Sequence, residues 1–243
     1  MPPKSISFDV LGTCFSFESI TTAIDERLGP RLKAINVDPK TLTFSWFYAA
    51  QRDFTYLSLV GSYTPIATVL KTTLRRACRI VELPESECPS DEDVAAVMEG
   101  VKNLEPREGL KGCFDGLRQG GWDVYAVTNG GVETSLKYFK AAGIELDEEH
   151  LLSCDSIQVA KPDMRVYENT THHLRTRGLS GVSGEDKWFV AAHAWDLIAA
   201  RKAGFRTAWL SFEEGEAVEE LFGGFDVVAG SMSELLEKMK KVG

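Results

Sequence analysis

The sequence has no long apolar run, since no uninterrupted segment approaches the ~20 apolar residues that a transmembrane helix needs. Its first ten residues, MPPKSISFDV, also lack the apolar core of a secretory signal peptide. We therefore expect a cytoplasmic protein that has no membrane partner.

Excess basic charge is missing as well. Lysine and arginine together number 27 against 36 aspartate and glutamate residues, so the formal net charge is -9. A general nucleic-acid-binding protein needs a basic surface that neutralises phosphates. We therefore expect no nucleic-acid partner.

Paired and clustered cysteines are also absent. The five cysteines show no C-x-x-C spacing and no histidine at the spacing of a metal site. An odd, dispersed set in a chain of this size indicates reduced thiols in an intracellular protein. These residues are Cys14, Cys78, Cys88, Cys113 and Cys154.

What the sequence does contain is a short stretch, residues 5–13, on which the interpretation of the whole chain depends. An alternating, mostly apolar run ends at Asp9, and the turn Gly12-Thr13 follows at once. In an α/β domain this pattern delivers a carboxylate to the carboxyl edge of a sheet. Gly12 permits a sharp turn, and the hydroxyl of Thr13 can donate a hydrogen bond back to Asp9. A buried strand that merely ends in a turn-forming aspartate is the simpler alternative.

Helical periodicity dominates from about residue 15 to residue 103. Apolar residues recur there at three- and four-residue spacing, and the alternation typical of strands is almost absent. Pro65 is suited to start one helix, and Ser90 or Asp91 is suited to cap another. The four segments that we predict to be helical are 19–28, 43–57, 65–81 and 91–101.

Beyond residue 106 the pattern changes to alternating helix and strand. Such alternation is typical of a parallel sheet covered by helices on both faces. Because the first strand precedes the helical region, we predict a discontinuous α/β core, residues 1–15 and 106–243, with an inserted all-helical cap domain, residues 16–105. The strands predicted after the insertion are 122–131, 150–157, 187–196, 206–212 and 226–230.

Polar residues with useful chemistry follow the predicted strand ends, and the carboxyl ends of parallel strands converge on one crevice. Besides Asp9, they include Thr128 and Asn129, which stand where a helix begins and can face an anion. Lys161 beside Asp9 would keep that carboxylate ionised and nucleophilic, because a neighbouring cation lowers the pKa of a carboxyl group. Taken singly, Lys161 reads as a surface lysine and Asp196 as a helix cap. Their order, one at each strand end, favours a common site.

Four motifs now stand in the order FDVLGT, VTNGG, KPDMRVYE and FVAAHAWD, with the helical insertion after the first. In this order they resemble the four motifs of the haloacid dehalogenase superfamily, over essentially the whole chain. KPDMRVYE and AWD are similar to the 2-haloacid dehalogenase (type II) branch rather than to the phosphatases. The resemblance implies a Rossmann-like core with a helical cap, a covalent ester on Asp9, and a small anionic substrate. It also allows a homodimer, because the family often dimerises through apolar cap and core surfaces.

A phosphatase is one alternative, because most of that superfamily transfers phosphoryl groups with Mg²⁺. In those enzymes an aspartate two residues after the nucleophile moves protons, but here that position is Leu11, which cannot. Ala192 replaces the first acid of the last motif, so that only Asp9 and Asp196 remain. Mg²⁺ needs a near-octahedral set of oxygen ligands. We therefore expect no metal site and no cofactor, with Mg²⁺ required only if the chain is a phosphatase.

Displacement of halide from carbon needs no metal. The resemblance implies that Asp9 attacks the carbon that bears the halide. Water, positioned or activated by Asp196 with help from Lys161, would then hydrolyse the ester. The residues expected to hold the nucleophile or the substrate are Leu11, Thr13, Thr128, Asn129, Tyr167 (which matches an active-site tyrosine of the family) and Trp195.

The sequence departs from the dehalogenase branch at three places. Leu11 stands where the branch usually has an aromatic residue. The arginine of an early cap helix aligns with Tyr48; Arg52 lies one turn further on the same face and is a candidate substitute, with a solvated surface arginine as an equal alternative. In the last motif, Ala191 and Ala192 replace two serines and His193 replaces an asparagine amide. We expect its imidazole in the site, where it can donate, accept or act as a base near neutral pH.

These departures leave other functions open. Leu11, Ala191 and Ala192 would widen the pocket, so a same-fold hydrolase or biosynthetic enzyme acting on a larger substrate is the main alternative. A non-catalytic binding protein that has kept the fold is the other. The acidic residues between 213 and 220 are expected to form a solvated face.

Overall fold

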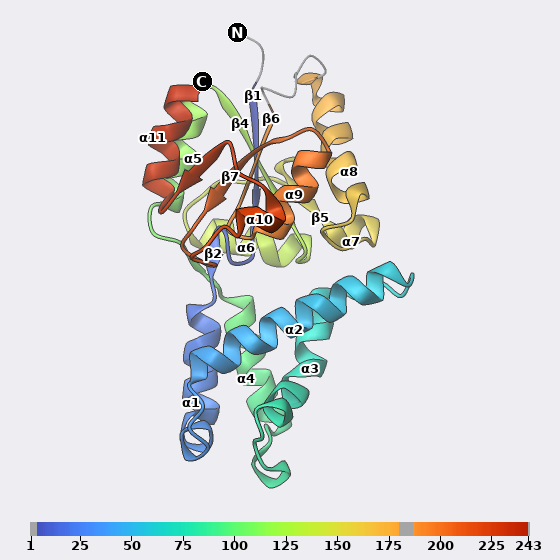
Figure 1. Ribbon diagram of the computed structural model, residues 1–243, viewed down its shortest axis with the longest axis vertical. Coiled ribbons are helices and arrows are strands. Elements are labelled where there is room, and N and C mark those ends of the chain that lie inside the picture. Colours follow the sequence, from blue (N-terminus) through green and yellow to red (C-terminus); the bar gives the residue numbers. More distant parts are fainter. Residues whose placement is uncertain (1–3, 180–186, 243) are drawn as a thin grey trace. The chain divides into compact units, whose positions relative to one another are not determined.

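The computed structural model describes residues 4–179 and 187–242 (Figure 1). The chain divides into two compact units: residues 1–15 with 106–243, here called the sheet unit, and residues 16–105, here called the helical unit. The sheet unit contains six parallel strands with helices on both faces, so the α/β fold class that the alternating pattern predicts is confirmed.

The strands of the sheet unit follow the order β5-β4-β1-β6-β7-β8, and every neighbouring pair is parallel. The strand order reverses at β1, because β4 and β5 extend the sheet on one side of it and β6 to β8 on the other. At such a switch point the connecting loops diverge and leave a crevice at the carboxyl ends of the strands. The strands are β1 (Lys4–Asp9), β4 (Trp122–Thr128), β5 (Leu151–Ser153), β6 (Lys187–Ala191), β7 (Arg206–Leu210) and β8 (Val227–Ala229).

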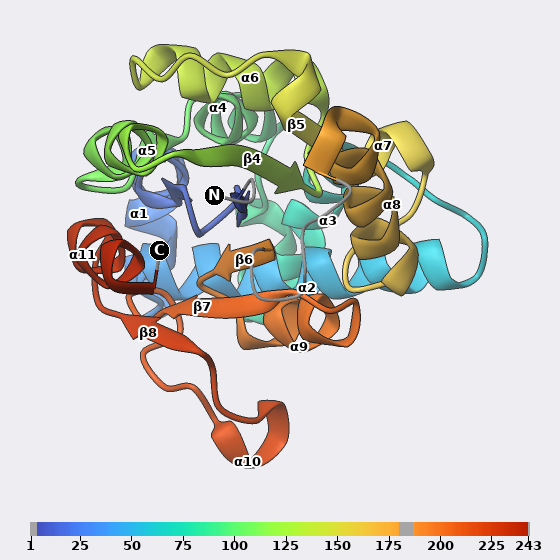
Figure 2. The ribbon, with the colours of Figure 1, turned by 90° about the horizontal axis from the view of Figure 1, so that it is seen from above.

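Helices cover both faces of this sheet, which is why its strands are rich in apolar residues on both sides. α5 packs against α11 on one face, and α8 packs against α9 on the other (Figures 1 and 2). The helices are α5 (Leu110–Gln119), α6 (Val132–Ala141), α7 (Cys154–Ile157), α8 (Met164–Leu174), α9 (Ala194–Lys202), α10 (Glu219–Phe222) and α11 (Met232–Val242), with a short 3-10 turn at Glu148–His150 and a π-helical turn at Arg175–Leu179.

The alternation of side chains along β1 decides where Asp9 points. Phe8 packs on Phe114 of α5, with ring centroids 4.8 Å apart. Successive strand residues face opposite sides of a sheet, so Asp9 faces the side covered by α8 and α9. That side holds an apolar cluster to which Tyr167 and Phe189 contribute. The carboxylate of Asp9 is thus directed toward the helices that carry the other polar residues of the last two motifs.

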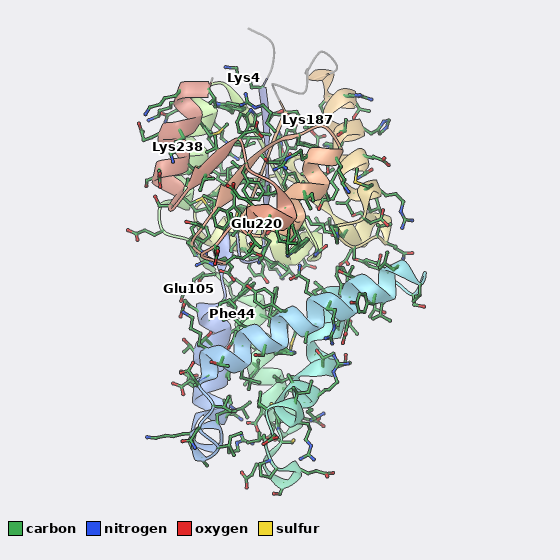
Figure 3. All side chains as sticks on the ribbon, in the orientation of Figure 1. Lys4, Phe44, Glu105, Lys187, Glu220 and Lys238 are labelled. Atoms are coloured by element: carbon green, nitrogen blue, oxygen red, sulfur yellow. The ribbon has the colours of Figure 1, made fainter. Side chains whose placement is uncertain are left out.

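The two edges of the sheet differ in the residues that they carry. Lys4 and Lys187 start β1 and β6 and mark the amino edge (Figure 3). Ser5 of β1 is paired with Lys187 of β6 in this parallel pair. The last residues of the two strands, Asp9 and Ala191, therefore both lie at the carboxyl edge.

The helical unit contains four helices, of which α2 packs on α3 and α1 packs on α4. α4 starts with a capping box, in which the Ser90 hydroxyl accepts from the Asp93 N–H and the Asp93 carboxylate accepts from the Ser90 N–H. Ser90 rather than Asp91 is therefore the cap. The chain passes between the units at two short paired strands. The elements are α1 (Glu18–Ala34), α2 (Pro39–Leu59), α3 (Ile66–Ile80) and α4 (Asp91–Lys102), with a 3-10 turn at Glu85–Glu87 and the strands β2 (Phe15–Ser16) and β3 (Glu105–Pro106).

Two of the predicted strands, 150–157 and 187–196, are wrong at their carboxyl ends. β5 stops at Ser153, whose hydroxyl accepts a hydrogen bond from the Asp155 N–H and starts α7. Lys161 consequently follows a short helix, not a strand. β6 stops at Ala191, and α9 includes Asp196 in its first turn. Apolar residues continue past both strand ends, and periodicity alone cannot separate a buried strand from a buried helix start.

No helix within the described ranges combines the length and the apolar character that crossing a membrane requires.

Candidate active site

Lys161 joins two carboxylates at the carboxyl edge of the sheet. Its Nζ donates to Oδ1 of Asp9 at 2.8 Å and to Oδ2 of Asp196 at 2.9 Å. The side chains of Lys161 and Asp196 are fully buried, and that of Asp9 is 7% exposed. The structure therefore brings three of the predicted catalytic residues, from three different motifs, into one ion-paired cluster.

The turn after β1 holds the second carboxylate oxygen of Asp9. The Thr13 hydroxyl donates to Oδ2 of Asp9 at 2.7 Å and accepts from the backbone N–H of Ala192 at 2.9 Å. Gly12 has a φ of 83°, in the left-handed region that a side chain would strain. This turn brings Thr13 back to the carboxylate, while the side chain of Leu11 stays partly exposed.

Asp196 is fixed by a second donor. The Tyr167 hydroxyl, from α8, donates to Oδ1 of Asp196 in a short hydrogen bond. Asp196 also lies in the first turn of α9, where a negative charge is favourable. The ammonium group of Lys161 lies 5.1 Å from the centre of the Phe189 ring, a cation–π contact that the sequence pattern did not indicate.

The two carboxyl groups of this cluster have pKa values that are shifted in opposite directions. Burial alone would raise the pKa of Asp9, but the ammonium of Lys161, assisted by His193, holds it well below its usual range. Burial and the charge of Asp9 together raise the pKa of Asp196, even though Lys161 opposes them. Burial would lower the pKa of Lys161, yet the two carboxylates raise it. Asp9 therefore remains ionised at neutral pH, which is the state that a nucleophile needs.

Thr128 and Asn129 order two loops beside this cluster. The Thr128 hydroxyl oxygen accepts from the Gly130 N–H at 2.9 Å. Oδ1 of Asn129 accepts from the backbone N–H of Lys161 at 3.1 Å, which ties the loop after β4 to the loop that carries the lysine. The role expected for both residues in holding a substrate stays a prediction.

His193 lies between β6 and α9, next to the nucleophile. Its Nδ1 is 3.7 Å from Oδ2 of Asp9, and its ring stacks on Trp195 with centroids 5.5 Å apart. Burial lowers the pKa of this imidazole, but Asp9 and, more weakly, Glu213 and Glu214 outweigh burial and raise it. The imidazole therefore stands in a negative environment within the site.

The prediction that the acidic residues between 213 and 220 form a solvated face is wrong for Glu213. Its side chain is 2% exposed and forms a short ion pair with Arg107. Oε2 of Glu214 accepts from the Ala194 N–H at 2.9 Å, in the first turn of α9. Both glutamates directly follow β7, so they start at the carboxyl edge of the sheet. Their position after a predicted strand indicates the carboxyl edge of the sheet. The acidic composition of the segment instead favoured the interpretation as a solvated face.

Tyr48 and Arg52 both lie on α2, in the helical unit. The Tyr48 ring packs near Phe44, with centroids 5.8 Å apart. Arg52 pairs with Asp53 at 3.1 Å, its side chain is 54% exposed, and Asp53 also pairs with Arg76. The roles of Tyr48 and Arg52 toward a substrate stay predictions.

A phosphatase-type Mg²⁺ site does not fit the residues around Asp9. Both oxygens of Asp196 already accept hydrogen bonds, and the side chains of Leu11 and Ala192 have no ligand atom. Across residues 4–179 and 187–242, no group of three or more His, Cys, Asp or Glu residues is arranged to hold a metal ion.

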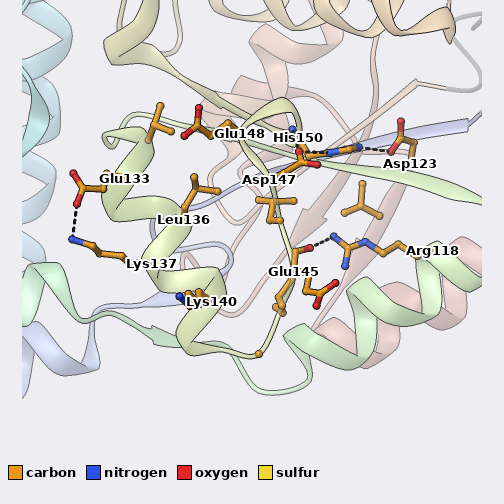
Figure 4. Close-up of a pocket in the computed structure, with 15 residues that line it drawn as sticks. Arg118, Asp123, Glu133, Leu136, Lys137, Lys140, Glu145, Asp147, Glu148 and His150 are labelled. Atoms are coloured by element: carbon orange, nitrogen blue, oxygen red, sulfur yellow. Dashed lines mark hydrogen bonds and ion pairs between the residues drawn. The ribbon is translucent and has the colours of Figure 1, made fainter.

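A separate hollow of about 1400 Å³ lies on the flank of the sheet unit and is lined by residues of α5, β4, α6 and the segment 143–150 (Figure 4). It contains none of the predicted site residues. His150 contacts Asp147 at 2.7 Å and Asp123 at 3.1 Å, and Lys137 pairs with Glu133 at 2.8 Å. Because these side chains contact one another and the predicted site residues lie elsewhere, we place the candidate site at the Asp9 cluster.

Known proteins are similar to this chain in sequence. An (S)-2-haloacid dehalogenase of Pseudomonas sp. (strain YL) is 28% identical over 223 residues, which cover 90% of this chain and 86% of that protein. Haloacetate dehalogenase H-2 of Moraxella sp. (strain B) is 26% identical over 220 residues, which cover 90% of this chain and 89% of that protein.

Solved structures share the fold. The L-2-haloacid dehalogenase of Xanthobacter autotrophicus, solved with chloropropionic acid covalently bound, superposes with a TM-score of 0.78 at 18% identity and covers 99% of both chains. The family model of the haloacid dehalogenase-like hydrolases matches residues 3–204. The chain therefore belongs to the haloacid dehalogenase-like hydrolase family.

Proposed function

We propose that the protein is a hydrolase of the 2-haloacid dehalogenase type that releases halide from a small 2-haloalkanoic acid. The Asp9 carboxylate attacks carbon 2, the carbon–halogen bond breaks, and an aspartyl ester forms. Water then hydrolyses the ester to a 2-hydroxy acid and regenerates Asp9. The observation that carries this proposal is the contact of Lys161 with both Asp9 and Asp196.

The contacts of Asp9 suit a displacement at carbon. Lys161 holds one carboxylate oxygen and Thr13 holds the other, so the group is ionised and has a fixed orientation. A fixed orientation lowers the entropic cost of reaching the attack geometry. Asp196 acts one step further away, because it holds Lys161 in place, and the Tyr167 hydroxyl in turn holds Asp196.

The substrate that fits this chemistry is an anion. Thr128 and Asn129 stand just before α6, and the amino end of a helix favours a carboxylate. We place the substrate carboxylate there.

The relatives support the proposal. Two of them are named for dehalogenation of 2-haloacids or haloacetate, and a structure of the same fold is titled as holding chloropropionic acid covalently. The proposed route uses a carboxylate and water, so it requires no metal or organic cofactor.

Halide release tests this function. Wild type and Asp9→Asn would be incubated with each enantiomer of 2-chloropropionate and 2-bromopropionate, with and without EDTA. We expect release by the wild type that survives EDTA and is lost in Asp9→Asn, which keeps the shape of the side chain but lacks the nucleophilic charge. Release that requires added Mg²⁺, or equal release by Asp9→Asn, would contradict the proposal.

A further inference from the structure

The proposed reaction needs a base for the water that hydrolyses the ester, and Asp196 is poorly suited to this task. Its Oδ2 accepts from Lys161 at 2.9 Å, its Oδ1 accepts from Tyr167, and its side chain is fully buried. To accept a proton from water, it would have to give up one of these bonds, which is costly in a buried site. Asp196 is better described as a positioning residue for Lys161.

His193 approaches Asp9 from another direction. Its Nδ1 lies 3.7 Å from Oδ2 of Asp9, whereas Lys161 binds Oδ1. This distance exceeds a hydrogen bond, but catalytic contacts often tighten only when substrate is bound. Stacking on Trp195, with an angle of 28° between the rings, fixes the plane of the imidazole.

The charge around His193 changes during the proposed reaction. Asp9 faces it from β1, and Glu213 and Glu214 face it from the segment after β7, with the charge of Glu213 offset by Arg107. Formation of the ester removes the negative charge of Asp9 and changes neither glutamate. The pKa of His193, which Asp9 holds above its usual value, therefore falls once the ester has formed. Formation of the ester therefore favours the neutral imidazole, which is the form that can accept a proton.

This inference rests on the proposed function. We infer that His193 is the general base of ester hydrolysis, charged while Asp9 is ionised and neutral while Asp9 is esterified. After the ester has formed, His193 gives its proton to solvent, which accounts for the one proton that net dehalogenation produces.

The hydrolysis step balances in atoms and charge. His193 takes one proton from the water as the water oxygen bonds to Cγ of Asp9. The bond between Cγ and the ester oxygen then breaks, and the departing alkoxide takes the second proton of the water. The enzyme is returned to ionised Asp9 and protonated His193, and a 2-hydroxy acid leaves.

Trapping of the ester tests this role. His193→Asn and His193→Gln would be mixed with excess 2-chloropropionate, and released chloride and intact protein mass would be followed over the first turnovers. We expect about one chloride per active site in a fast first phase. We also expect accumulation of protein that carries the substrate without its chloride, and a steady rate at least about 100-fold below wild type. The fast phase itself shows that Asp9 is working and that the variant is folded.

The pH dependence gives a second readout that a merely structural role would not move. In the wild type, the rate of ester breakdown should rise with pH as His193 loses its proton, and this dependence should vanish in His193→Asn. Glu214→Gln can still accept from the Ala194 N–H but removes a negative charge that faces the imidazole. In Glu214→Gln, the midpoint of the pH dependence of ester breakdown should therefore move to lower pH, and the ester should not accumulate.

The outcomes separate this inference from the function on which it rests. A folded His193→Asn variant that turns over at the wild-type rate, with no accumulated ester, would overturn the role of His193 and leave the dehalogenase proposal intact. Slow turnover in which the first chloride is released as slowly as later ones would also overturn the role of His193 as the base of ester hydrolysis. In that case, His193 would act on the displacement of halide. No chloride from the wild type would overturn the proposed function and the inference together.

Discussion

One ammonium group compensates two carboxylates in the candidate site. Lys161 is fully buried and binds both Asp9 and Asp196, so that removing it would leave two negative groups in a place with little water. A buried ion pair contributes little net stability when compared with apolar residues, but a broken one is expensive. The lysine therefore matters to the fold as well as to the chemistry.

Lys161→Met should cost the sheet unit about 3–5 kcal/mol of unfolding free energy and abolish halide release, because Asp9 and Asp196 would lose their shared partner. Lys187→Met is the matched control. Lys187 is also buried, but its ammonium binds Thr171 and the Ala203 carbonyl. Burial lowers the pKa of Lys187 to about 8, with Arg175 adding to the effect, so its charge is already costly.

Chemical denaturation of the two lysine variants checks this expectation. Lys161→Met should lower the unfolding free energy clearly more than Lys187→Met does. Lys187 binds only neutral groups, so its removal leaves no carboxylate without a partner. Equal costs would mean that the ion pairs with Asp9 and Asp196 are not what holds the carboxyl edge together.

At the scale of single residues, sequence position predicted much of the cluster. Asp9, His193 and Asp196 stand at or just after the end of a strand, and parallel strands bring such ends together. Lys161 comes instead from the loop after α7. The position of Glu213 after a predicted strand indicates the carboxyl edge, but its burial could not be predicted in the same way. Its burial depends on the ion pair with Arg107, which comes from a distant segment and leaves no local pattern.

At the scale of elements, one close approach of helices depends on a glycine. A β carbon at Gly100 of α4 would lie 2.8 Å from the backbone oxygen of Ser19 and 3.2 Å from Cβ of Ala23, both on α1. Gly112 of α5 would meet nothing within 4 Å. Replacing each of the two glycines by alanine therefore compares the cost of overpacking at Gly100 with the gain in helix propensity at Gly112.

Gly100→Ala should lower the unfolding free energy by about 1–3 kcal/mol, because overpacking against α1 outweighs the ~1 kcal/mol that alanine gains in a helix interior. Gly112→Ala should raise the unfolding free energy by about 0.5–1 kcal/mol, because only the propensity gain applies. Thermal or urea unfolding of both variants measures the two signs. Stabilisation by Gly100→Ala would contradict the close contact of α1 with α4.

A second element-scale feature connects α1 to the start of α4. Asp93 closes the capping box with Ser90 and pairs with Arg27 at 3.0 Å and Arg31 at 2.9 Å. Burial would raise the pKa of Asp93, but the hydrogen bonds of Arg31 and the Ser90 amide outweigh it and lower the pKa to about 2. A carboxyl group whose pKa is depressed on folding stabilises the protein above its unfolded pKa, and this stability is lost as the pH falls through the folded pKa.

Asp93→Asn keeps an oxygen for the Ser90 amide and removes the charge that the arginines bind. It should lower the unfolding free energy by about 1 kcal/mol at pH 7, a modest value because the arginines are partly solvated. The difference from wild type should shrink between pH 5 and pH 3, because the Asp93 carboxyl group of the unfolded wild-type chain takes up its proton there, while that of the folded protein, with a pKa of about 2, does so only at lower pH. Urea denaturation at these pH values checks the trend, and a difference that grows toward pH 3 would have the wrong sign.

At the scale of the whole molecule, the chain leaves the sheet unit after β1 and returns before α5. We propose that the two units are a catalytic core and a cap, as the insertion of helices into an α/β pattern predicts. The sequence identified the insertion because hydrophobic periodicity changes from 2 to 3.6 and back. It did not locate the strand ends within the core, because apolar residues continue into α7 and α9.

If the units are separate domains, they should also differ in how they open. Gly100→Ala should reduce hydrogen-exchange protection in α1 to α4, while amides of β4 and β6 keep their wild-type protection. Native-state hydrogen exchange followed by mass spectrometry resolves the two sets of peptides. An equal loss of protection in both sets would show a single cooperative unit and contradict the proposed division.

A rapid-quench experiment detects the proposed ester on Asp9 itself. Wild-type protein would be mixed with excess 2-chloropropionate, quenched with acid, digested and mapped by mass spectrometry. We expect the peptide containing Asp9 to gain the mass of the substrate less hydrogen chloride, with the modification on Asp9. Chloride release without an adduct at any quench time, or an adduct on another residue, would contradict it.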